Sequence, residues 1–66
     1  MMVYIIRSRK GNHVATLKSW NGVVTLTQSP SGHWTWCVGR QIESVLAWCA
    51  NHFLRWEVTY DEKESV

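Results

Sequence analysis

The stretch His13–Gln28, HVATLKSWNGVVTLTQ, decides the fold because it carries a β-hairpin signal at its centre. The Asn21-Gly22 pair suits the two middle positions of a type I′ turn, where both residues need a positive φ. Runs rich in Val, Leu and Thr lie on either side of the pair, which predicts strands over residues 13–20 and 23–28. We therefore expect the protein to be built around an antiparallel hairpin.

Two more strands are predicted next to this hairpin. The β-rich run Val3–Ser8 is followed by the turn composition of residues 10–12, Lys-Gly-Asn, which indicates a first hairpin. After the second hairpin, Ser29–Gly32 has Pro and Gly where a type I turn favours them. The run His33–Val38, HWTWCV, is then expected to form a fourth strand.

After Gly39 the spacing of apolar residues becomes helical. The pattern predicts an amphipathic helix from about Arg40 to His52, with Asn51 as a left-handed stop. Residues 54–60, LRWEVTY, alternate and predict a half-buried last strand. The expected class is α+β in ββββαβ order, a small antiparallel sheet of four to five strands with one helix packed on one face. The residues expected at the centre of the core are Leu17, Leu26, Leu46, Cys49 and Phe53.

The length of 66 residues predicts one domain with a small core. We expect a globular unit over residues 1–60 and a charged, frayed tail over residues 61–66. No apolar run is long enough for a membrane span or a signal peptide, so a cytoplasmic protein without a membrane partner is expected. Cys37 and Cys49 are interpreted as buried thiols rather than a disulfide, and no zinc-type spacing is present. We accordingly expect no metal and no cofactor.

Charge is distributed unevenly along the chain. Residues 1–40 contain five Lys and Arg and no acid, giving +5, whereas residues 41–66 carry two bases and five acids, giving −3, which together make the net charge of +2. Either this reflects chance in a short chain or it marks a basic surface for an acidic partner.

The hairpin register assigns side chains to the two faces of the sheet, because the side-chain period of a strand is two. One face is expected to hold Leu17 and Leu26, against which the helix packs, and the other Lys18. If the remaining turns are tight, the face of Lys18 also carries Arg7, Arg9, Trp20, Trp34 and Trp36. This face then has no acidic residue. A bulge, or a loop longer or shorter by one residue, would instead turn Trp34 and Trp36 into the core. The candidate binding residues are thus Arg7, Arg9, Lys18, Trp20, Trp34 and Trp36.

The stretch GHWTWCVGRQIESVLAWCANHF, residues 32–53, has a glycine, an aromatic strand and an amphipathic helix in succession. Over about residues 13–53 this layout resembles the sheet-plus-helix DNA-binding domains of the phage integrase arm-binding type. The resemblance implies a sheet laid in a DNA groove with the helix behind it. This chain departs from that pattern in having extra strands at both ends and fewer Arg and Lys on the expected face.

Enzymatic activity is not expected, because the sequence has no nucleophile elbow and no glycine-rich phosphate loop, and its three His lie in different predicted elements. The leading interpretation is a small binding module that contacts nucleic acid through a basic, Trp-bearing face. The alternative is a protein-binding inhibitor or adaptor from a phage or mobile element, of the anti-CRISPR type, which uses the same face against a host protein. Self-association into a homodimer stays open.

Overall fold

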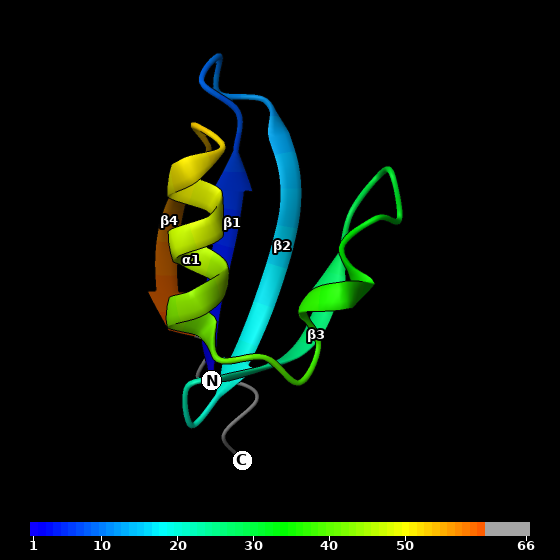
Figure 1. The fold of residues 1–66 in the computed structure, drawn as a ribbon, viewed down its shortest axis with the longest axis vertical. Helices are drawn as coiled ribbons and strands as arrows, with labels where there is room; N and C mark the ends of the chain where they lie inside the picture. The colour runs from blue at the N-terminus through cyan, green and yellow to red at the C-terminus, as the bar shows by residue number, and fades with distance from the viewer. Residues whose placement is uncertain (61–66) are drawn as a thin grey trace.

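The computed structural model describes residues 1–60, which form a four-stranded antiparallel sheet, one α-helix and a short 3-10 helix (Figure 1). The sheet order is β3-β2-β1-β4, so the first strand lies in the middle of the sheet and the last strand at one edge. The expected α+β class is confirmed. The tail expected at residues 61–66 lies outside the described residues. The elements are β1 (Met2–Arg7), β2 (His13–Trp20), β3 (Val23–Gln28), η1 (Thr35–Cys37), α1 (Ile42–Asn51) and β4 (Arg55–Tyr60).

The β2–β3 hairpin begins as predicted and then changes register. Asn21 and Gly22 have φ values of 53° and 78°, as a type I′ turn requires. An irregularity beyond the turn inserts Thr25, so Lys18 lies opposite Leu26. One extra residue sends all later side chains of a strand to the other face. The prediction that Leu26 belongs to the core is therefore wrong, and this side chain is 44% exposed.

The β1–β2 connection also differs from the prediction, but without changing the faces. Its five residues, Ser8–Asn12, replace the expected two-residue turn and are closed by a 2.9 Å hydrogen bond from the Ser8 N–H to the Asn12 carbonyl. Ile6 lies opposite Ala15, whereas the two-residue turn would place it opposite Leu17. The shift is two residues, an even number, so Ile6 keeps its face of the sheet and is buried in the core.

The predicted strand over His33–Val38 is wrong, because this run forms a loop that contains η1. Trp34 and Cys37 are both buried, and the Cys37 N–H donates to the Trp34 carbonyl at 3.2 Å. In a 3-10 turn, residues three apart lie on the same side, so a spacing of three buries both side chains without a strand. The chain then returns to β3 through backbone bonds between Gly39, Arg40 and Val24.

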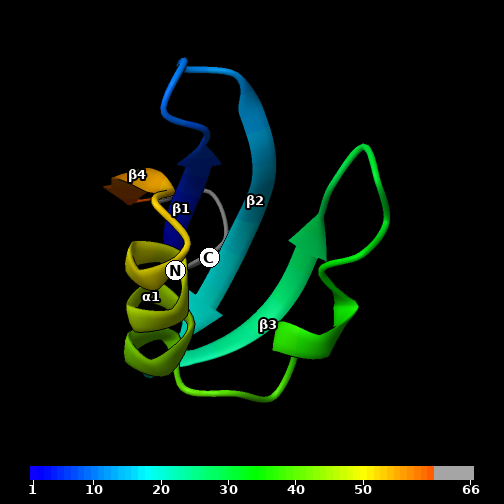
Figure 2. The ribbon, with the colours of Figure 1, turned by 45° about the horizontal axis from the view of Figure 1, so that its top comes forward.

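One face of the sheet is covered by α1, which lies over β1 and β4, and by η1, which lies beside β3 (Figure 2). Leu17 and Cys49 are fully buried here, as predicted, and Leu46 is partly buried against them. Phe53, expected in this core, is instead exposed. No helix within residues 1–60 is long and apolar enough to cross a membrane. The core consists of Ile6, Ala15, Leu17, Val24, Trp34, Cys37, Ile42, Val45 and Cys49.

The opposite face of the sheet, called here the far face, carries the side chains that alternate away from α1. Val3 and Lys18 lie opposite each other on it, as do Ile5 and Thr16. Arg7 follows in the same alternation, so the prediction that Arg7 and Lys18 share a face is confirmed.

Candidate functional site

The six predicted contact residues do not form one surface. Arg7 and Lys18 lie on the far face, and Arg9 lies in the β1–β2 turn next to Arg7. Trp20 is the last residue of β2, at the opposite end of the sheet, and is half-exposed as expected. The remaining two tryptophans lie on the side of the sheet that α1 covers.

Trp34, Trp36 and Trp48 pack against one another and are called here the tryptophan cluster. Ring centroids are 6.1 Å apart for Trp34 and Trp36, 5.6 Å for Trp34 and Trp48, and 5.0 Å for Trp36 and Trp48. Trp34 is 6% exposed, whereas Trp36 is 38% and Trp48 37% exposed. The prediction that Trp34 and Trp36 lie on the face of Lys18 is therefore wrong. Both side chains lie on the other side of the sheet because a 3-10 turn replaces the expected strand.

The rim of the tryptophan cluster is held by further contacts within the protein. The ring of His52 stacks on Trp48 with 3.9 Å between centroids. Arg40 donates a 3.0 Å hydrogen bond from Nε to the Trp36 carbonyl, and its guanidinium carbon lies 5.8 Å from the Trp36 ring centroid. These contacts are favourable cation–π and stacking geometries. Arg40 and His52 are thus already in contact with Trp36 and Trp48.

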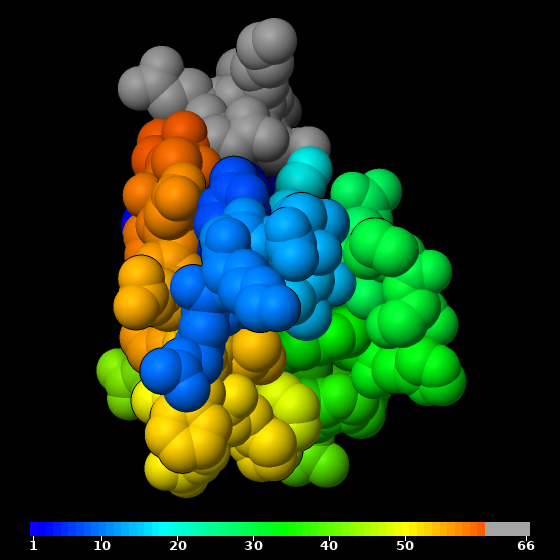
Figure 3. Space-filling model, turned by 90° about the horizontal axis from the view of Figure 1, so that it is seen from above, coloured from blue at the N-terminus to red at the C-terminus, as the bar shows by residue number. Residues whose placement is uncertain are grey.

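A different surface gathers positive charge at the end of the sheet, where the β1–β2 turn meets the start of β4. Figure 3 shows this end of the molecule, with the turn beside the segment that links α1 to β4. A pocket of about 420 Å³ opens here, a size typical of small-ligand sites. Of the described residues that line it, four are cationic and one, Glu57, is acidic. The four cations, called here the basic end, are Arg7, Arg9, Lys10 and Arg55.

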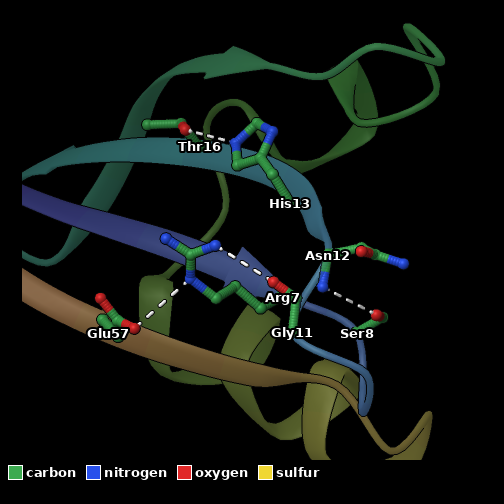
Figure 4. Close-up of polar contacts among 7 residues, drawn as sticks. All are labelled: Arg7, Ser8, Gly11, Asn12, His13, Thr16 and Glu57. Atoms are coloured by element: carbon green, nitrogen blue, oxygen red, sulfur yellow. Dashed lines mark hydrogen bonds and ion pairs between the residues drawn. The ribbon is translucent and has the colours of Figure 1, made fainter.

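Strand pairing forces some of these charges together. Arg7 lies directly opposite Arg55 on β4 and opposite His13 on β2. Like charges at opposed positions of a sheet destabilise it. Glu57 offsets part of the repulsion, with an ion pair of 3.3 Å from its Oε1 to the Arg7 Nε (Figure 4). Four positive charges and one negative charge leave the pocket at a formal +3, which favours an anionic ligand.

The guanidinium of Arg7 is held in place before any ligand arrives. Its Nη1 donates a 3.2 Å hydrogen bond to the Gly11 carbonyl, while Nε faces Glu57. The turn itself is fixed by Ser8, whose hydroxyl accepts from the Asn12 N–H at 3.2 Å (Figure 4). A cation that is already oriented loses less side-chain entropy on binding, so the turn preorganises the pocket.

Sequence reasoning missed three residues of this region. Lys10 could have been found, since it follows Arg9 in a predicted turn. Arg55 could not, because nothing in the sequence indicates that β4 pairs with β1 and places Arg55 opposite Arg7. Phe53 was assigned to the core from its helical spacing, and it lines a shallow pocket beside the basic end together with Arg9 and Arg55.

The other features of the described chain offer less chemistry. A pocket of about 400 Å³ between β3 and the loop before η1 is lined by His13, Trp34 and neutral residues, with no Lys, Arg, Asp or Glu. Over residues 1–60, no three His, Cys, Asp or Glu side chains are grouped to hold a metal ion. Cys37 and Cys49 are buried free thiols, as predicted. The basic end is therefore the strongest candidate site.

No protein-family model, curated protein or solved structure matches this chain. The resemblance to integrase arm-binding domains thus remains an interpretation of the sequence alone. A function has to be argued from the geometry and charge of the surfaces described above.

Proposed function

We propose that this protein is a small binding module that contacts the phosphate backbone of nucleic acid through the basic end. The observation that carries the proposal is the convergence of four cations from β1, the β1–β2 turn and β4 around one pocket, to which Glu57 is the one carboxylate that residues 1–60 contribute. Arg and Lys that neutralise phosphates release condensed counterions, which supplies most of the affinity of small nucleic-acid-binding proteins.

The composition of the basic end favours phosphate over a simple carboxylate ligand. Three of its four cations are Arg, whose planar fork can donate two parallel hydrogen bonds to a phosphate or to a carboxylate, so the number of charges decides between the two. Three more cations around the preorganised Arg7 allow successive phosphates of one strand to be engaged. A single carboxylate ligand would neutralise only one of the three excess charges.

A binding titration at several salt concentrations tests this proposal. Labelled single-stranded and duplex DNA are titrated with the parent protein and with the double variant Arg9→Ala/Lys10→Ala. We expect the variant to bind more weakly and the slope of log K against log salt to fall by between about 1 and 2, the value for two lost phosphate contacts. Arg40→Ala is the control for loss of a positive charge elsewhere and should bind like the parent, because Arg40 lies at the rim of the tryptophan cluster. Equal binding by the double variant and the parent contradicts the proposal.

A second candidate function rests on the tryptophan cluster. Trp36 and Trp48 remain more than a third exposed, and Arg40 lies beside Trp36. Trp and Arg dominate the energetics of protein interfaces. This arrangement supports the alternative of an inhibitor or adaptor that binds a host protein, or of a homodimer. Its affinity for a protein partner would depend on Trp36 and would change little with salt.

A further inference from the structure

Phe53 is the most exposed of the large apolar side chains described, with 70% of its surface accessible. It also has a φ of 61°, in the left-handed region. The chain there leaves α1 through two backbone hydrogen bonds, from the Phe53 N–H to the Ala50 carbonyl at 3.1 Å and from the Leu54 N–H to the Cys49 carbonyl at 2.9 Å. This is a Schellman ending with Phe53 at its left-handed position, so the prediction that Asn51 is the left-handed stop is wrong.

Neither helix capping nor core packing explains a phenylalanine at this position. Gly is favoured in the left-handed conformation because it has no Cβ, and a bulky residue there is strained. The ring recovers little of that cost by burial, since most of it faces solvent. Phe53 therefore costs folding free energy, and such strain is typical of residues that contact a ligand.

The ring of Phe53 lies beside two arginines. The guanidinium carbon of Arg9 lies 5.9 Å from the ring centroid of Phe53. Phe53, Leu54, Arg9 and Arg55 line one shallow pocket, and Arg9 and Arg55 also line the pocket of the basic end. An aromatic surface and a cationic pocket thus adjoin and share two arginines, as a base and its neighbouring phosphate would require.

We infer that the basic end takes single-stranded nucleic acid, with one unstacked base lying on the ring of Phe53 and the adjacent phosphates held by Arg9 and Arg55. This inference rests on the proposed function and names its substrate class. In a duplex both faces of each base are covered by its neighbours, so an exposed aromatic ring gains a stacking partner only from an unpaired strand.

The test uses fluorescence anisotropy with three labelled probes of equal length: an oligothymidylate, an abasic strand with the same phosphates, and a duplex. Phe53→Gly removes the ring and suits the left-handed conformation, so we expect its melting temperature to be equal to or higher than that of the parent. Phe53→Tyr keeps the ring and is the matched control. A melting curve of each variant confirms that it is folded.

We expect Phe53→Gly to bind the oligothymidylate about 5- to 150-fold more weakly than the parent, the factor equivalent to one lost base stack. Its affinity for the abasic strand and the duplex should be unchanged, and Phe53→Tyr should bind all three probes like the parent. An oligoribouridylate probe then distinguishes RNA from DNA as the source of the strand.

Two results separate failure of this inference from failure of the proposed function. If Phe53→Gly weakens all three probes equally or none of them, while Arg9→Ala/Lys10→Ala weakens all three, phosphate binding stands and base stacking on Phe53 is refuted. If the parent binds none of the probes at low salt, the proposed function itself is refuted.

Discussion

The tryptophan cluster and the basic end differ in how completely their side chains are paired by contacts within the protein. In the cluster each ring contacts the other two, and Arg40 and His52 complete its rim. At the basic end, by contrast, strand pairing sets Arg7 against Arg55 and the lining supplies one carboxylate for four cations. Conspicuous residues can therefore be structural, and a surface with excess like charge is the better candidate for a ligand.

The largest effect expected from this comparison is the loss of Trp34. Because its side chain is buried, Trp34→Ala should cost about 3 to 5 kcal/mol of unfolding free energy, close to the whole stability of a domain this small. Trp36→Ala removes a half-exposed ring from the same cluster and should cost about 1 kcal/mol. Thermal denaturation followed by circular dichroism measures both. Equal, small losses would show that Trp34 is not a core residue.

A moderate effect is expected from the thiols beneath the cluster. Burial raises the pKa of Cys37 from 9.0 to about 11, with the nearby Cys49 adding to the shift and Arg40 opposing it. Burial likewise raises the pKa of Cys49 to about 11. The unfolded chain loses these protons first, so the thiols' contribution to stability is complete below pH 9 and is lost as the pH rises from about 9 to about 11.

Urea unfolding at pH 7.5 and pH 10.5 measures this dependence. The double variant Cys37→Ala/Cys49→Ala should lose less stability over that interval than the parent, because it lacks both titrating groups. All other residues are the same in the two proteins, so a difference between their pH dependences reports on the thiols alone. An identical pH dependence in parent and variant would mean that the thiols are accessible to water.

The smallest effect is expected at the basic end, where a substitution should raise the free energy of unfolding instead of lowering it. Arg55→Thr removes a like charge opposite Arg7 and places a good strand former in β4. We expect it to raise stability by about 0.2 to 1 kcal/mol at low salt, a gain that shrinks as salt screens the repulsion. Glu57→Gln, which removes the ion pair to Arg7, should lower stability slightly. Destabilisation by Arg55→Thr at low salt would argue against repulsion at this site.

The sequence predicts the fold wherever the pattern is local. The Asn21-Gly22 turn, the helix and the last strand follow from turn chemistry and periodicity, and their positions are close to those predicted. The predicted register of β3 is wrong from Thr25 on, because one inserted residue places Leu26 on the opposite face of the sheet. No local feature of the sequence indicates this bulge. The candidate site is only half predictable for a related reason. Arg7 and Arg9 are neighbours in sequence, whereas Arg55 joins them through the pairing of β4 with β1.

The central claim, that the basic end and not the tryptophan cluster binds the ligand, is tested most directly by a two-dimensional 1H–15N spectrum of the protein during titration with a short oligothymidylate. Backbone amides and the tryptophan indole N–H groups report on both regions in one experiment. We expect the shift changes to concentrate at residues 8–12 and 53–56, with the indole signals of Trp36 and Trp48 unchanged. Shifts concentrated at Trp36, Trp48 and Arg40, with residues 8–12 unmoved, would contradict the account.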